Sequence, residues 1–168
     1  VQSWPLPTSV DFSTTSSLQA EVQVVDGNWV LGSRGVRTLD PYYDRVLCLG
    51  DTTWRDYEAD VHLTVHAFTP PAPGPPTYLV THFGVAMRWN GHHQDGFQPH
   101  RKWYPLGAKG EFLIRESPDS SSWRLLFDQS EDKPQLMSPL LKDRDLGRPI
   151  RIRTQVETVA DGQTRYRF

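Results

Sequence analysis

Apolar and polar residues alternate along the stretch from Tyr57 to Phe68. The odd-numbered positions up to Ala67 are apolar, and the even-numbered positions from Glu58 to His66 are polar or charged. A period of two is typical of a half-buried β-strand, because a helix would place its apolar residues three and four positions apart. The pattern therefore predicts one long strand whose acidic and imidazole side chains face solvent.

The segment from Tyr78 to Asn90 alternates in the same way and predicts a second long strand. One face of this strand is apolar, and the other combines polar residues with two small ones, Gly84 and Ala86. Small residues leave room for a ligand or another chain to approach the sheet. The polar face comprises His82, Gly84, Ala86, Arg88 and Asn90.

The remaining expected elements are shorter strands separated by turn residues. Asp26-Gly27 predicts a hairpin between the first two of them, and Asp161-Gly162 predicts one between the last two. Residues 128–148 have an irregular pattern, and no segment carries a helical stripe of about twelve residues. Many strands without helices predict an all-β fold, a two-sheet antiparallel β-sandwich of the jelly-roll type. The short strands are expected at 21–25, 28–31, 36–39, 45–49, 111–116, 123–128, 150–159 and 164–168.

A chain of 168 residues is long enough for one domain with its own core and short for two. Residues 1–20 are expected to form an extended N-terminal lead-in, and residues 21–168 a single sandwich domain. The sequence stops at Phe168, inside an expected strand, so we expect the sandwich to lack a final strand.

Charge and cysteine content narrow the functional classes. Eighteen basic residues against 20 acidic ones give a net charge of −2, and this balance argues against general nucleic-acid binding. A single cysteine excludes an internal disulfide and a cysteine zinc site. Cys48 lies in the apolar run 46–49, where a small buried residue is expected. No secretory apolar region and no apolar stretch of membrane-spanning length is present.

Three segments occur in an order that resembles a known group of proteins. They are the segment from Tyr43 to Asp51, the segment Trp54-Arg55-Asp56-Tyr57-Glu58, and the segment from Phe83 to Trp89. From about residue 28 onward the chain resembles the concanavalin A-like lectin/glucanase superfamily, in its laminin-G-like bacterial branch. The resemblance implies a two-sheet jelly roll whose concave sheet often carries a glycan site.

Glu58 and Asp60 are the first candidates for chemistry, because two residues apart on a strand they share one face, with Cα atoms about 6.6–7 Å apart. A carboxylate pair can serve a glycoside hydrolase. The laminarinase-like members of the superfamily use a Glu-x-Asp-x-x-Glu motif on such a strand. Here His62 or Leu63 stands where the second Glu of that motif would fall, so no enzyme activity is expected.

The histidines and acids of the chain do not predict a metal site by their spacing. His62 and His66 would be about 13 Å apart on a strand, too far for one ion. Some laminin-G-like relatives bind calcium, and Asp51 and Asp56 are weak candidates for such an ion. No cofactor is otherwise expected.

The loop from residue 91 to residue 110 mixes aromatic, amide, imidazole and carboxylate groups. Sugar sites and protein interfaces both use these side chains, so the two interpretations stay open. At the other end of the chain, arginines alternate with apolar residues and predict either a solvated outer face or a docking surface for an acidic partner. These arginines are Arg151, Arg153, Arg165 and Arg167.

The sequence as a whole favours a non-catalytic, glycan-binding recognition module outside the cytoplasm, periplasmic or secreted. The first alternative is a structural or accessory subunit that docks onto a larger complex, with membrane association through a partner or through an anchor outside this sequence. The second is a laminarinase-like glycoside hydrolase. The expected partner is a glycan or a protein, and no transmembrane segment is expected. The expected ligand-binding residues are Glu58, Asp60, His62, His82, Arg88, Asn90, His92, Asp95, Trp103 and Tyr104.

Overall fold

The computed structural model divides the chain into two compact units, Val1–Trp54 and Arg55–Phe168. The expected boundary after residue 20 differs from this division, because the strands up to residue 48 group with the preceding segment. The expectation of a single domain over residues 21–168 stays a prediction. The structure describes residues 4–39, 45–66, 80–89, 91–93, 104–105, 108–117, 120–129, 136–141 and 146–168.

The first unit contains one short helix and two pairs of antiparallel strands. The helix α1 (Leu18–Glu21) is a single turn whose buried residue is Leu18, a local element that the sequence pattern does not predict. The strands pair as β1 with β4 and as β2 with β3. Their bounds are β1 (Gln23–Asp26), β2 (Trp29–Gly32), β3 (Gly35–Thr38) and β4 (Val46–Cys48).

The predicted hairpin at Asp26-Gly27 is wrong, although the turn itself forms. Gly27 has a φ of +84°, and the Asp26 carboxylate accepts a hydrogen bond from its backbone N–H at 2.7 Å. The indole N–H of Trp29 donates to the Asp26 carbonyl at 2.8 Å. The turn therefore leads from one strand pair to the next, and the hairpin of this unit lies between Gly32 and Gly35.

In the second unit, a three-stranded sheet has the order β13-β12-β5. Burial alternates at every residue of β5 (Tyr57–Thr64), so the predicted long strand is confirmed over these eight residues. The predicted final hairpin is also confirmed, because β12 (Pro149–Thr158) and β13 (Thr164–Arg167) pair antiparallel around the 3-10 turn Ala160–Gly162.

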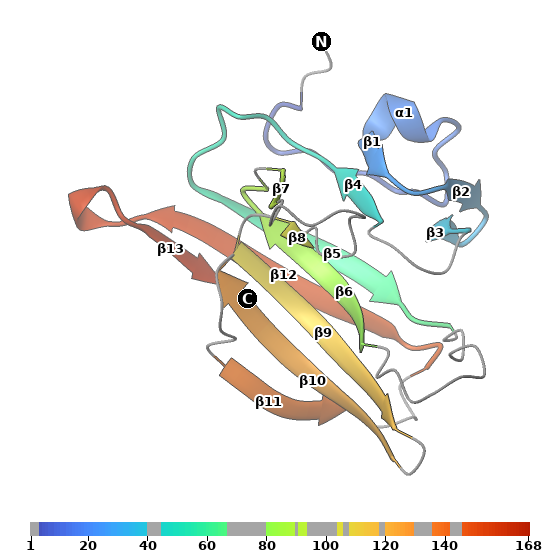
Figure 1. Ribbon diagram of the computed structural model, residues 1–168. Helices are drawn as coiled ribbons and strands as arrows, with labels where there is room; N and C mark the ends of the chain where they lie inside the picture. Colours follow the sequence, from blue (N-terminus) through green and yellow to red (C-terminus); the bar gives the residue numbers. More distant parts are fainter. Residues whose placement is uncertain are drawn as a thin grey trace. The chain divides into compact units, whose positions relative to one another are not determined.

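The second unit also contains a four-stranded sheet with the order β11-β10-β9-β6 (Figure 1). Strand β11 (Leu136–Leu141) lies in the segment expected to be irregular. Its sequence does not alternate and contains Pro139, a residue that sheets tolerate at an edge strand, where β11 lies. The other strands of this sheet are β6 (Val80–Met87), β9 (Ala108–Ser117) and β10 (Ser120–Gln129). Strands β7 (His92–His93) and β8 (Tyr104–Pro105) form a separate two-stranded sheet.

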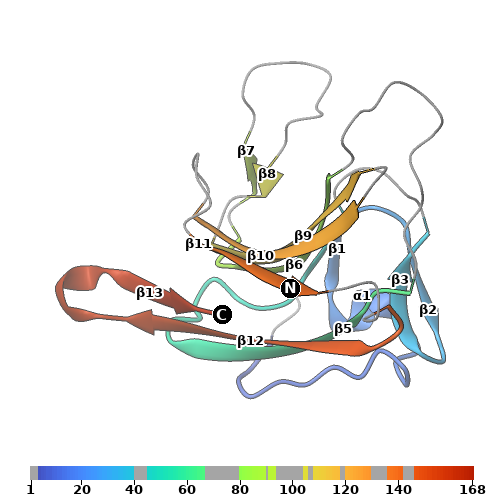
Figure 2. The ribbon, with the colours of Figure 1, turned by 90° about the horizontal axis from the view of Figure 1, so that it is seen from below.

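The two larger sheets contact each other through their apolar faces, and Figure 2 shows β12 and β5 in one layer and β6, β9 and β10 in the other. Met87, Ala108 and Val156 form the buried cluster between them. The hydroxyl of Thr154 lies 3.0 Å from the sulfur of Met87. The described residues therefore form an all-β structure of antiparallel sheets. None of its helices has the length and apolar character needed to cross a membrane.

Candidate functional site

The solvent-facing side of β5, β12 and β13 gathers charged side chains from all three strands, and we refer to it as the arginine face. Glu58, Asp60 and His62 of β5 are all exposed there, as the alternation predicts. They lie opposite Gln155, Arg153 and Arg151 of β12, because these are their partners in the antiparallel register. The arginine face comprises Glu58, Asp60, His62, Arg151, Arg153, Gln155, Glu157, Arg165 and Arg167.

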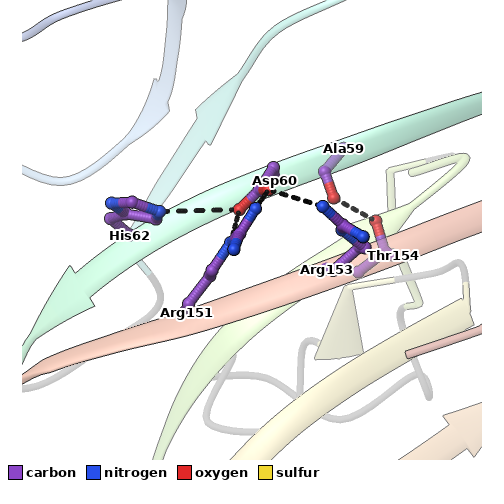
Figure 3. Close-up of polar contacts among 6 residues, drawn as sticks. All are labelled: Ala59, Asp60, His62, Arg151, Arg153 and Thr154. Atoms are coloured by element: carbon purple, nitrogen blue, oxygen red, sulfur yellow. Dashed lines mark hydrogen bonds and ion pairs between the residues drawn. The ribbon is translucent and has the colours of Figure 1, made fainter.

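The Asp60 carboxylate is bound by its neighbours (Figure 3). The guanidinium of Arg151 donates to it from Nε at 2.8 and 3.0 Å and also from Nη2. Arg153 and His62 place nitrogens 3.7 and 3.6 Å from its oxygens. The hydrogen bonds from Arg151 hold the pKa of Asp60 below its usual value, and the same contact raises the pKa of Arg151. This carboxylate is therefore an ion-pair partner, and a ligand would have to compete with Arg151 for it.

A second carboxylate on the arginine face contacts two arginines of the last strand. Glu157 lies 3.4 Å from Arg165 and 3.0 Å from Arg167, and Arg167 also donates to the side-chain carbonyl of Gln155 at 2.6 Å. The four arginines are all exposed, as both the solvated outer face and the docking surface require, so the two interpretations stay predictions. Within the part of the chain that the structure describes, the strip is partly neutralised by Asp60 and Glu157.

A different set of polar residues lies on β6 and β9, and we call the surface formed by His82, Gly84, Ala86, Lys109 and Glu111 the His82 face. The imidazole Nδ1 of His82 lies 3.1 Å from Glu111 Oε2. Glu111 is only 15% exposed, whereas His82 is 41% exposed. Gly84 and Ala86 are exposed beside this pair, so the carboxylate–imidazole pair borders two small residues. Lys109, the cross-strand partner of Ala86, is buried at the edge of this surface.

The opposite side of the same two strands holds the pair in place. Phe83 and Phe112 are cross-strand partners and stack with ring centroids 5.1 Å apart. Residues next to one another on a strand point to opposite faces, so His82 and Glu111 lie on the side of the sheet opposite this stack. Stacked aromatic partners are a stabilising cross-strand pair in sheets.

Sequence reasoning missed Glu111 and Lys109 as members of a site. Lys109 is 4% exposed and two residues from Glu111, which places a buried basic residue next to the carboxylate. The alternation that would identify them is present in the sequence: Lys109 and Glu111 stand between Ala108, Gly110 and Phe112, which form the apolar side of the strand. The predicted strand began at Glu111, whereas β9 begins at Ala108, so the alternation was not extended to Lys109.

The predicted ligand-binding residues do not form one surface. Glu58, Asp60 and His62 lie on the arginine face, and His82 lies on the His82 face of the other sheet. The apolar faces of these two sheets contact each other, so their polar faces point away from one another. The sequence pattern identifies the faces of individual strands, but it does not show which strands share a sheet.

Arg88 directly follows β6, and its φ of +50° takes it out of the alternation of that strand. Its guanidinium donates to the hydroxyl of Thr164 at 3.0 Å and to the backbone carbonyl of Arg55 at 3.3 Å. It therefore connects the end of β6 to β13 and to the start of the second unit. His92 and Tyr104 lie in β7 and β8, which pair with each other. The predicted residues Asn90, Asp95 and Trp103 lie outside the described residues.

The two calcium candidates and the cysteine have local roles. Asp51 accepts a hydrogen bond from the backbone of Thr53 at 2.8 Å, and Asp56 accepts one from the backbone of Thr158. These hydrogen bonds lower the pKa of both carboxyls. Burial raises the pKa of the half-buried Cys48 thiol. Over the described ranges, no three histidines, cysteines or acids form a group suited to a metal ion.

We compared the chain with known protein families, curated proteins and solved structures. The chain matches no family model, no curated protein and no solved structure.

Proposed function

We propose that this protein is a non-catalytic recognition module that acts outside the cytoplasm and binds a glycan on the His82 face. We also propose that its sheets belong to a two-sheet jelly roll. The observation that carries the function is the Glu111 carboxylate, paired with His82 at 3.1 Å and bordered by exposed Gly84 and Ala86.

The chemistry of the pair fits sugar hydroxyls. A carboxylate accepts hydrogen bonds through two oxygens, and an imidazole offers a donor or an acceptor at its second nitrogen. Small-molecule sites combine a few such oriented polar groups with an apolar surface. The Ala86 methyl and the bare backbone at Gly84 supply a flat floor on which the ring of a sugar can lie. The predicted rim of Trp103 and Tyr104 would add aromatic stacking.

We propose binding without catalysis because a glycoside hydrolase needs two carboxyl groups about 5–9.5 Å apart. Asp60 is engaged by Arg151 on the arginine face. Among the residues whose side chains the structure describes, Glu111 is the single carboxylate of the His82 face. A hydrolase and a docking subunit are the competing functions, and the same experiment distinguishes them.

The test is a glycan array probed with the full chain and four variants. We expect saturable binding by the wild type, loss of binding by Glu111→Gln, and loss by Ala86→Phe, which covers the floor without removing a polar group. Glu58→Gln is the matched control, because it removes one exposed carboxylate from the other sheet. On the uncharged glycans of the array, binding by Glu58→Gln should equal that of the wild type. Trp103→Ala tests the predicted rim.

Three results would reject the proposal. Equal loss in Glu111→Gln and Glu58→Gln would place the effect outside the His82 face. Silence of the wild type across the array, together with co-purification in a larger assembly, would favour the docking subunit. Release of reducing sugar from a β-glucan, abolished by Glu111→Gln, would show a hydrolase.

A further inference from the structure

Four arginines follow one another across the two neighbouring strands of the arginine face. Arg151 and Arg153 are two positions apart on β12, and Arg165 and Arg167 are two positions apart on β13, spacings of about 6.6–7 Å. Gln155 pairs with Arg167, so Arg153 and Arg167 are diagonal neighbours about 7–8 Å apart. The four guanidinium groups therefore follow a line about 20 Å long.

Two carboxylates form ion pairs with these four guanidinium groups and neutralise only part of their positive charge. Asp60 contacts Arg151 and Arg153, and Glu157 contacts Arg165 and Arg167, so each group of three has one excess positive charge. With Glu58 included, four arginines and three carboxylates leave the arginine face a net charge of +1. An arginine has five N–H donors. Arg153 is 66% exposed, and it donates no hydrogen bond within the described part of the chain. The line is therefore oriented by its own acids and still has donors for a further anion.

The composition of the face indicates the class of that anion. Among the described residues, the arginine face has no aromatic or large aliphatic side chain. Hot spots of protein interfaces combine arginine with aromatic or apolar anchors, and this face supplies the arginines without such anchors, so a protein fits it less well than a hydrophilic polyanion does. Planar guanidinium groups bind carboxylate and sulfate-like groups through paired hydrogen bonds.

We propose that the arginine face binds an anionic polysaccharide, a sugar chain that carries carboxylate or sulfate groups. This site lies on the opposite sheet from the His82 face and does not depend on the function proposed for it. The ligand lies along β12 and β13, where its acidic groups meet Arg153, the most exposed of the four arginines, and it competes with Asp60 and Glu157 for the remaining donors.

The experiment measures binding of the full chain to dextran sulfate, to polygalacturonate and to neutral dextran. We expect saturable binding to one or both anionic polymers that weakens as salt rises, and none to dextran. The double variant Arg153→Gln/Arg167→Gln should lower the affinity about tenfold. The matched control Arg34→Gln/Arg37→Gln removes the same charge from exposed positions of the first unit and should change the affinity less than about twofold.

A third variant separates ligand binding from a purely structural ion-pair network. Glu157→Gln removes a competing carboxylate and releases Arg165 and Arg167, so we expect it to raise the affinity about threefold. No binding to either anionic polymer, an equal loss in the two double variants, or a loss in Glu157→Gln would overturn the proposal. Glu111→Gln should leave this binding unchanged, so the two proposals fail independently.

Discussion

At the scale of single residues, contact partners decide what an acidic side chain can do. Asp60 and Glu111 are both acidic residues on the polar side of a strand, and the sequence pattern does not distinguish their roles. Asp60 is bound by Arg151 from the neighbouring strand, whereas Glu111 is paired with an imidazole and bordered by small residues. The Asp60 carboxylate therefore forms an ion pair within the sheet, whereas the surroundings of the Glu111 carboxylate suit the ligand proposed for it.

The ion pair of Asp60 predicts a pH dependence of stability. The pKa values of Asp60 and Asp56 are lowered from 3.8 by hydrogen bonds from Arg151 and from the Thr158 backbone. The folded state therefore holds fewer protons than the unfolded state, and stability is lost as pH falls below about 4. In urea titrations, Asp60→Asn should be less stable than the wild type at neutral pH, and the difference should vanish near pH 2.

Glu58→Gln is the control for this pH series, because it changes an exposed carboxyl on the same strand that has no ion pair among the described residues. A constant difference between Asp60→Asn and the wild type at every pH would contradict the prediction.

At the scale of elements, strict alternation and turn residues predict strands more reliably than pairings. The eight residues of β5 and the final hairpin follow from such local patterns. The partner of β1 does not follow from a local pattern, because Gln23 pairs with Cys48, 25 positions later in the sequence. The β2–β3 hairpin lies between these two strands in the sequence. Strand β11 lacks alternation, so its place in the sheet comes from pairing with β10.

The turn of the final hairpin offers an element-scale prediction. Asp161 has a φ of +70°, a left-handed conformation that Asp tolerates and that a β-branched residue does not. Asp161→Val should therefore lower the free energy of unfolding by about 1–2 kcal/mol, because such a residue pays the full left-handed penalty. Asp161→Asn should be close to neutral. Denaturant unfolding of both variants checks this, and equal stabilities would refute it.

At the scale of the whole second unit, contact between two apolar sheet faces separates the polar ones. The sheet of β5, β12 and β13 and the sheet of β6 and β9 meet at Met87, Ala108 and Val156. This packing places the arginine face and the His82 face on opposite outward sides. Two polar surfaces of different chemistry are the consequence, where the sequence pattern suggests one.

The packing between the sheets predicts an energetic coupling. Val156 is 1% exposed and Met87 is 3% exposed, so each truncation to alanine should cost about 2–3 kcal/mol. If the two side chains share one core, the double variant should depart from additivity by about 0.5 kcal/mol or more. Unfolding titrations of the two single variants and the double variant measure this. Arg165→Gln, an exposed control, should stay within about 0.5 kcal/mol of the wild type.

The sequence by itself determined the all-β class, the long strand at Tyr57, the final hairpin and the polar sides of β5 and β6, because these features depend on alternation and turn chemistry within a few residues. Only the tertiary structure decided that β1 pairs with β4, that β11 joins a sheet, and that Glu111 meets His82 while Asp60 meets Arg151. These contacts join residues from different strands. They depend on register and on which apolar faces pack together, and a local pattern contains neither.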